Sequence, residues 1–110
     1  MDMNKYQQLA QRTSNTHTSW DKIVNGLLGL HGEGGELADL FKKAEYQEHE
    51  PDYGHMAKEL GDVLWYVAEI ATGLGYSLAD IARLNIDKLK ARYPYGFDPD
   101  KSLHRKAGDD

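Results

Sequence analysis

Apolar residues recur at steps of three and four along most of this chain, which is the period of an α-helix. The alternation of apolar and polar residues that marks a strand is absent from the sequence. Short polar breaks separate the periodic stretches, which cover residues 4–12, 23–41, 52–74 and 78–93. We therefore expect an all-α domain, an antiparallel bundle resembling a four-helix bundle, that assembles further through helix packing.

Residue types that prefer turns and caps mark the expected ends of these helices. Residues 13–16 read Thr-Ser-Asn-Thr and close the first helix. Gly75 is a stop signal for the third helix, and Pro94 ends the last one. Ser77 followed by Asp80 resembles a capping box, with Asp in the usual Glu position.

A cluster of five glycines in the second helical stretch allows two interpretations. Each glycine costs about 0.8–1 kcal/mol relative to Ala inside a helix, so the segment could instead be a phosphate-binding loop. It fits neither the P-loop nor the dinucleotide fingerprint, because Lys-Ser/Thr is missing and the spacing differs. We favour a helix whose glycines allow another backbone or a ligand to approach closely. The five are Gly26, Gly29, Gly32, Gly34 and Gly35.

Length and composition limit the chain to one modest domain. It has 110 residues, of which 40% are hydrophobic and 28% charged, too apolar for a disordered chain. The absence of Cys excludes disulfide scaffolds, thiol catalysis and zinc-thiolate sites. A net charge of −5 argues against broad nucleic-acid binding, and no apolar run approaches the roughly 20 residues that span a bilayer. We expect a soluble cytoplasmic protein without nucleic-acid or membrane partners.

Two pairs of acids lie on helix faces that a bundle would bury. At about 100° per residue, Glu33 and Glu36 are about 60° apart and share the face of Leu37. Glu59 and Asp62 repeat this arrangement on the third helix. Bringing the pairs together would confine four anions, which is costly without compensating charge.

Bound divalent cations would relieve this repulsion. Ligands that are all carboxylates favour hard ions, Mg²⁺ and, as a substitute, Mn²⁺. A ferritin-like di-iron site competes, but it requires Glu-x-x-His, and neither pair ends in His. The remaining alternative is that the acids face water or pair with the lysines Lys42, Lys43, Lys58 and Lys88.

A second polar set lies on the last helix. Asn85 lies within the apolar stripe, and a polar side chain there needs a partner. Lys88 and Arg92 lie within about 60° of it on the same helix. Asn85 could hold a carboxylate or a substrate oxygen, and the two cations could neutralise phosphates. Equally, all three could serve the fold alone, with the cations extending their stems along apolar surface.

These stretches resemble the MazG-like, all-α nucleoside triphosphate pyrophosphohydrolases. The resemblance is carried by residues 29–37, 58–66 and 85–94, followed by Gly96 and Phe97. The first two stretches contain the family's ordered pattern, Glu-x-x-Glu and then Glu-x-x-Asp. The resemblance implies a MazG-like domain over residues 1–97, with its core at about 20–94 and a polar tail at 98–110. The resemblance is greatest to single-domain members of the family, including phage-encoded ones. If this chain is also phage-encoded, we expect it in the cytoplasm of the host.

The resemblance implies Mg²⁺-dependent hydrolysis of a (deoxy)nucleoside triphosphate to the monophosphate and pyrophosphate. It also implies a homodimer, or a homotetramer built from dimers, with sites near subunit boundaries. The matching metal ligands and catalytic residues are Glu33, Glu36, Glu59 and Asp62. Asn85 and Lys88 match positions that line the nucleotide site, and Arg92 matches less well.

The chemistry would be attack of water on the α-phosphorus. A bound metal ion lowers the pKa of water and offsets charge on phosphate, and Glu36 is our candidate for accepting the water proton. Candidates for stabilising the leaving pyrophosphate are Lys58, Lys88, Arg92, Arg105 and Lys106.

Recognition of the base is less constrained by the sequence. Trp20 is our preferred residue for stacking on a base, whereas we expect Trp65 to pack in the core. Thr13 and Asn15 could bond a base edge or cap a helix. Two functions of other classes stay open: a nucleotide sensor without turnover, and a non-catalytic helical dimerisation module.

Overall fold

The structure, a computed structural model, describes residues 1–105 and 108. The described part is helical, with no β-strand beyond an isolated bridge between Pro94 and Gly96. The predicted all-α class is confirmed. In chain order the helices are α1 (Met3–Gln11), α2 (Ser19–Tyr46), α3 (Tyr53–Leu74), α4 (Leu78–Arg92) and α5 (Pro99–Leu103).

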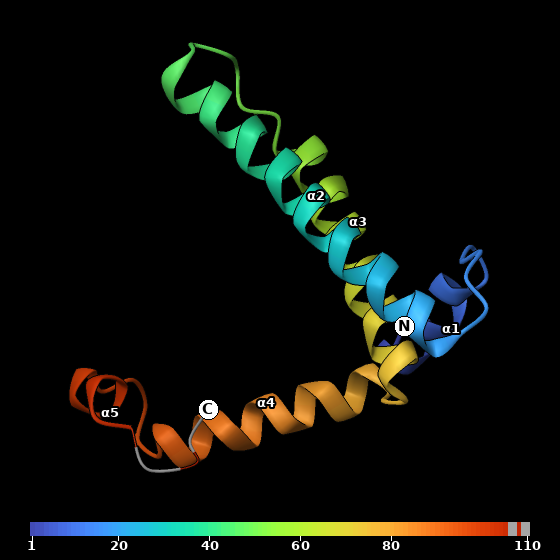
Figure 1. The fold of residues 1–110 in the computed structure, drawn as a ribbon. Coiled ribbons are helices and arrows are strands. Elements are labelled where there is room, and N and C mark those ends of the chain that lie inside the picture. Colours follow the sequence, from blue (N-terminus) through green and yellow to red (C-terminus); the bar gives the residue numbers. More distant parts are fainter. Residues whose placement is uncertain (106–107, 109–110) are drawn as a thin grey trace.

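The helices α2 and α3 form a long antiparallel hairpin (Figure 1). The Gly-rich segment is part of the continuous helix α2, so the helical interpretation is confirmed. Close approach explains two of its glycines: a Cβ on Gly26 would collide with Ile70, and one on Gly29 with the ring of Tyr66. Gly32, Gly34 and Gly35 have no such neighbour within 4 Å in the described chain.

The helix ends follow the sequence signals. Ser77 Oγ accepts a hydrogen bond from the Asp80 backbone N–H at 3.0 Å, which caps the start of α4. Gly75 ends α3 in the left-handed conformation, with φ 82°. Tyr93, the residue before Pro94, is the C-cap of α4.

The small core lies at the base of the hairpin, where α1 packs against α3 and the start of α4. Its buried apolar residues are Ala10, Ala68, Ala71 and Leu78. Gln7 joins the three helices, because its side chain donates to Thr72 Oγ1 and accepts from the Leu78 backbone N–H at 2.7 Å. This base positions α1 and the 12–18 segment beside the hairpin.

From this base, α4 leads away from the hairpin, and the two arms form a V (Figure 1). The Cα radius of gyration is 17.0 Å, whereas a compact domain of this length has about 13 Å. The expected polar tail contains the short helix α5, which Asp98 caps through its side chain. No helix in the described part of the chain combines the length and apolar character needed to cross a membrane.

Candidate active site

Three of the four predicted metal-binding acids meet where α2 faces α3. Glu33 comes from α2, and Glu59 and Asp62 come from successive turns of α3. Each offers a carboxylate oxygen, and these oxygens all lie within 4.8 Å of one another. The i, i+3 spacing on α3 and the packing of the hairpin therefore bring the acids together as the sequence pattern predicts.

Two of the clustered carboxylates have an unsatisfied oxygen. Glu33 Oε2 and Glu59 Oε2 are buried and find no hydrogen-bond partner among the described residues. The other Glu59 oxygen, Oε1, lies 3.3 Å from His55 Nε2, one turn earlier on α3. Unpaired buried carboxylate oxygens are costly, so the arrangement needs a further positive partner.

The electrostatics of Glu33 reflect this crowding. The Glu59 carboxylate, through a shared proton, together with partial desolvation and the charge of Glu36, raises the pKa of Glu33 to about 7. A divalent cation would replace that proton. Oxygen donors of this kind suit hard cations such as Mg²⁺ or Mn²⁺, so the residues present fit the metal that the sequence pattern implies.

A cleft of about 370 Å³ opens beside the acids. Glu33 and Asp62 line it together with Thr13, Trp65 and Tyr66. Trp65 and Tyr66 meet edge to face, with ring centroids 5.0 Å apart. The cleft thus combines carboxylates with an aromatic wall, an arrangement suited to a ligand with an anionic, metal-bound end and an apolar ring.

The sequence matches a family model along most of this region. Residues 24–97 match the MazG nucleotide pyrophosphohydrolase domain.

This chain belongs to the MazG family.

The chain is also similar to the "Gene 37 protein" of Mycobacterium phage L5, with 38% identity over 76 residues. The similar region is 63% of this chain and 64% of that protein, so the two correspond over less than two thirds of the phage protein. No solved structure matches the chain significantly.

The fourth acid of the MazG pattern lies outside the tight cluster. Glu36 is exposed on α2 and is not part of the group whose oxygens lie within 4.8 Å. It is nevertheless close enough to Glu33 to raise the pKa of that carboxyl group. Lys58 is exposed on α3 and is not a lining residue of the cleft.

The predicted substrate-binding residues of α4 are separated from this cluster. Asn85 and Lys88 are exposed on the arm that leads away from the hairpin. Arg92, half-buried at the end of the arm, lies over the ring of Tyr93 with its guanidinium carbon 5.8 Å from the centroid. Within the chain described, none of the three lines the cleft.

The structure places Trp65, and not Trp20, at the cleft. Trp20 lies in the first turn of α2 and is 72% exposed. It precedes Glu33 by 13 residues, about 20 Å along a helix. Trp65 packs against the core as expected, and it also lines the cleft.

Arg105 is exposed in the segment after α5, and Lys106 lies outside the described residues.

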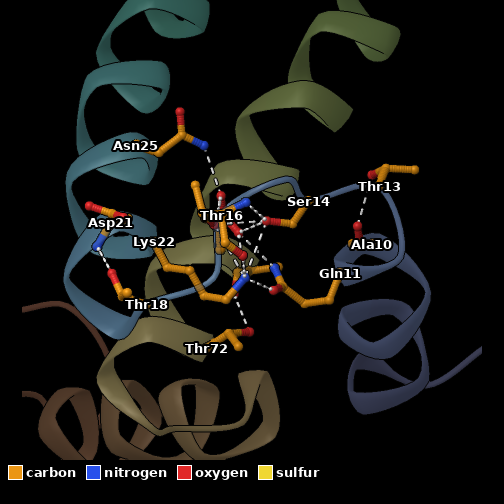
Figure 2. A network of polar contacts seen from close by, with 12 residues as sticks. Ala10, Gln11, Thr13, Ser14, Thr16, Thr18, Asp21, Lys22, Asn25 and Thr72 are labelled. Carbon is orange, nitrogen blue, oxygen red and sulfur yellow. Dashed lines mark hydrogen bonds and ion pairs between the residues drawn. The ribbon is translucent and has the colours of Figure 1, made fainter.

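A fifth acid, Glu69, was missed by the sequence analysis. Its side chain is 0% exposed. The residues that bind it come from α1, the 12–18 segment and α2, and Figure 2 labels them. Ser14 Oγ donates to Glu69 Oε1 at 2.7 Å, and Asn25 Nδ2 donates to Glu69 Oε2 at 2.8 Å. The other members of this network, which we call the Glu69 network, are Gln11, Thr16 and Lys22.

The chemistry of Glu69 differs from that of Glu33. Burial alone would raise the pKa of Glu69, but the hydrogen bonds from Ser14, Asn25 and Gln11, with the charge of Lys22, outweigh burial and lower it. Glu69 is therefore an ionised structural anchor. Its position seven residues after Asp62, on the same face of α3, was the available signal in the sequence.

Proposed function

We propose that this MazG-family chain hydrolyses a (deoxy)nucleoside triphosphate to the monophosphate and pyrophosphate. The observation that carries the proposal is the pair of buried, unpartnered oxygens of Glu33 and Glu59 in a cluster with Asp62. The adjoining cleft is lined by aromatic side chains that suit a nucleoside. The protein would act in the cytoplasm, because the nucleoside triphosphates are there. For a phage-encoded chain this would be the cytoplasm of the host.

Glu33, Glu59 and Asp62 would hold Mg²⁺, or Mn²⁺ in its place, with Glu36 as a fourth ligand on the exposed side. When bound, the cation supplies neutralisation of phosphate charge and a lowered pKa for water. Through this cation, the three clustered carboxylates would hold the anionic end of the substrate beside the cleft. Glu36, exposed and next to Glu33, would accept the proton from the attacking water.

A second copy of the chain would complete the protein. One face of α2 carries apolar residues at alternating steps of four and three, the spacing of helix-packing seams. Three large side chains on this face, Trp20, Leu27 and Phe41, are exposed in the single chain. The long hairpin and the diverging α4 arm also leave the molecule far less compact than a domain of its size. These features support a homodimer, or a dimer of dimers, in which α4 of one copy brings Asn85, Lys88 and Arg92 toward the site of another.

The test is to incubate the purified protein with a panel of NTPs and dNTPs and Mg²⁺, then to separate the products by chromatography. Monophosphate and pyrophosphate are expected. Diphosphate and phosphate would mean that a different bond is cleaved. Nucleotide binding without products would favour a sensor, and absence of binding would favour a dimerisation module.

Glu33→Gln should abolish pyrophosphate release with every substrate that the wild type hydrolyses. Glu45→Gln, at an exposed position near the end of the same helix, is the matched control and should retain it. Equal loss in both variants would contradict the assignment of the acid cluster.

A further inference from the structure

The cleft is lined by Thr13, whose hydroxyl group has its hydrogen-bonding capacity almost fully used. Thr13 Oγ1 donates to the backbone oxygen of Ala10 at 2.9 Å. Thr13 Oγ1 also accepts a hydrogen bond from Trp65 Nε1 at 2.9 Å. A threonine hydroxyl has one hydrogen to donate and two lone pairs to accept with. One lone pair is therefore left, and toward a ligand Thr13 can only accept.

Thr13 is held in this state from both sides. Trp65 Nε1 also donates to the Ala10 backbone oxygen at 3.0 Å, which ties the end of α1 to α3. On the other side, Ser14 and Thr16 bind the buried Glu69 carboxylate. Thr13 itself is exposed, yet the backbone on each side of it is anchored to α3. The acceptor is thus preorganised, so a ligand gains its hydrogen bond without the cost of ordering the segment.

We propose that Thr13, Trp65 and Tyr66 form a nucleobase subsite, in which Thr13 Oγ1 accepts a hydrogen bond from an N–H group of the base. The proposal rests on the proposed function, because the acids that line the same cleft would take the phosphates. Bases have apolar faces that pack on aromatic side chains and edges that carry amino or imino N–H groups. The subsite therefore selects the orientation in which such a group, rather than a carbonyl oxygen or ring nitrogen, points to Thr13.

The first test measures binding, so that it does not depend on turnover. The chain has two tryptophans, and in a Trp20→Phe background Trp65 is the sole indole. With Ca²⁺ present, a nucleoside triphosphate should quench Trp65 emission, whereas inorganic tripolyphosphate should not. Thr13→Val should weaken the nucleotide's apparent affinity about fivefold to tenfold, the loss expected for one hydrogen bond. Thr13→Ser keeps the acceptor and should stay within twofold of the parent. The absence of quenching by every nucleotide would overturn the subsite.

The second test identifies the group that bonds to Thr13. The best ligand of a ribonucleotide panel is compared with its analogue lacking an N–H donor: zebularine for cytidine, purine riboside for adenosine or 3-methyluridine for uridine, each as the triphosphate. Guanosine has two such donors, so it is compared with both 1-methylguanosine and inosine. On the parent protein, the analogue should bind about fivefold to tenfold more weakly than the natural nucleotide. On Thr13→Val, the analogue and the natural nucleotide should bind equally well. A penalty of equal size in both proteins would mean that Thr13 does not contact the base.

A ribose hydroxyl is the other possible donor, since its O–H could reach the same lone pair. The 2′-deoxy and 3′-deoxy forms of the best nucleotide distinguish the two. If Thr13→Val removes the discrimination against a deoxy form and leaves that against the base analogue unchanged, the base assignment is wrong.

The two proposals fail in different ways. Quenching that depends on Thr13, without pyrophosphate release, would refute the hydrolase function and retain the subsite. If pyrophosphate is released and Thr13→Val leaves both KM and kcat unchanged, the subsite is refuted and the hydrolase function is retained. In an active enzyme, Thr13→Val should raise KM about fivefold to tenfold and change kcat less than twofold, because the contact is to the base and not to the reacting phosphates.

Discussion

The ring of Tyr66 on α3 occupies the space beside Gly29 on α2 that any larger side chain would need. A Cβ on Gly29 would lie closer to three ring atoms of Tyr66 than real carbon contacts allow. Since Tyr66 also lines the cleft, this contact links the packing of the hairpin to the shape of the candidate site. Glycine at position 29 therefore sets how closely the acid-bearing helices approach.

Gly29→Ala should destabilise the protein by about 1–3 kcal/mol, the usual cost of overpacking, despite the better helix propensity of alanine. Gly32→Ala on the same helix is the matched control. The Cβ of this alanine would meet nothing within 4 Å in the described chain. Gly32→Ala should therefore raise the free energy of unfolding by about 0.8–1 kcal/mol through helix propensity. Urea denaturation measures both, and a Gly29→Ala variant as stable as Gly32→Ala would contradict the close contact.

Asp62→Asn should uncouple metal binding from folding. In the wild type, Mg²⁺ at a hundred times its Kd should stabilise the native state by about 2.7 kcal/mol. The variant should lose most of this shift and at least a hundredfold in turnover, because the cation contributes several kcal/mol to the transition state. Thermal melts with and without Mg²⁺ measure the first effect. A variant that keeps the full Mg²⁺-induced shift would exclude Asp62 as a ligand.

The raised pKa of Glu33 predicts that the stability of the protein depends on pH differently with and without metal. Between its ordinary value of 4.5 and about 7, the folded protein binds a proton that the unfolded chain has released. This contribution to stability is complete below pH 4.5 and is lost as the pH rises through 7. Without metal, the Tm should therefore fall between pH 6 and pH 8.

The cation competes with the same proton, so the Mg²⁺-induced increase in Tm should be small at pH 6 and large at pH 8. Glu33→Gln is the control, because it removes the titrating carboxyl group and keeps all five histidines. The wild type and this variant should differ in their pH profiles. Identical profiles would show that Glu33 does not titrate near neutral pH.

The hairpin and the three clustered acids could be predicted from the sequence because both follow from helix periodicity. Glu33, Glu59 and Asp62 lie on apolar stripes, and two stripes that pack must bring them together. The spacing could not show that Glu36, only three residues after Glu33, stays exposed outside the tight cluster. That depends on the rotation of α2 about its axis within the hairpin.

The path of the 12–18 segment could not be predicted, because it depends on contacts distant in the sequence. Thr13 joins the cleft through Trp65, 52 residues later in the chain. Ser14 reaches Glu69 across 55 residues. Periodicity identifies the faces of helices but not the side chains that a loop will meet, so the sequence favours Trp20 over Trp65 as the aromatic residue of the site.

Glu69→Gln should destabilise the protein by about 2–3 kcal/mol, because hydrogen bonds to the buried charge are weakened and Lys22, 16% exposed, loses its ion-pair partner. The lowered pKa of Glu69 means that its contribution is present above about pH 4.5 and is lost as the pH falls further. Acid unfolding of the wild type should therefore be steeper than that of the variant. If the variant matches the wild type in both urea and acid, the Glu69 network is not an anchor.

The diverging α4 arm exposes leucine side chains that a second copy of the chain would cover. Leu84 is 55% exposed and Leu89 38% exposed in the single chain, and leaving both in water forgoes the stabilisation that burial of leucine gives. Light scattering should therefore give a mass of about two or four times 12.4 kDa. Replacing both leucines by Gln should shift the protein toward monomer and reduce turnover, because Asn85 and Lys88 of the partner copy would leave the site. Leu103→Gln on α5, also an exposed leucine, is the control and should keep both mass and activity. A doubly substituted protein that is monomeric and fully active would show that one chain forms the whole site.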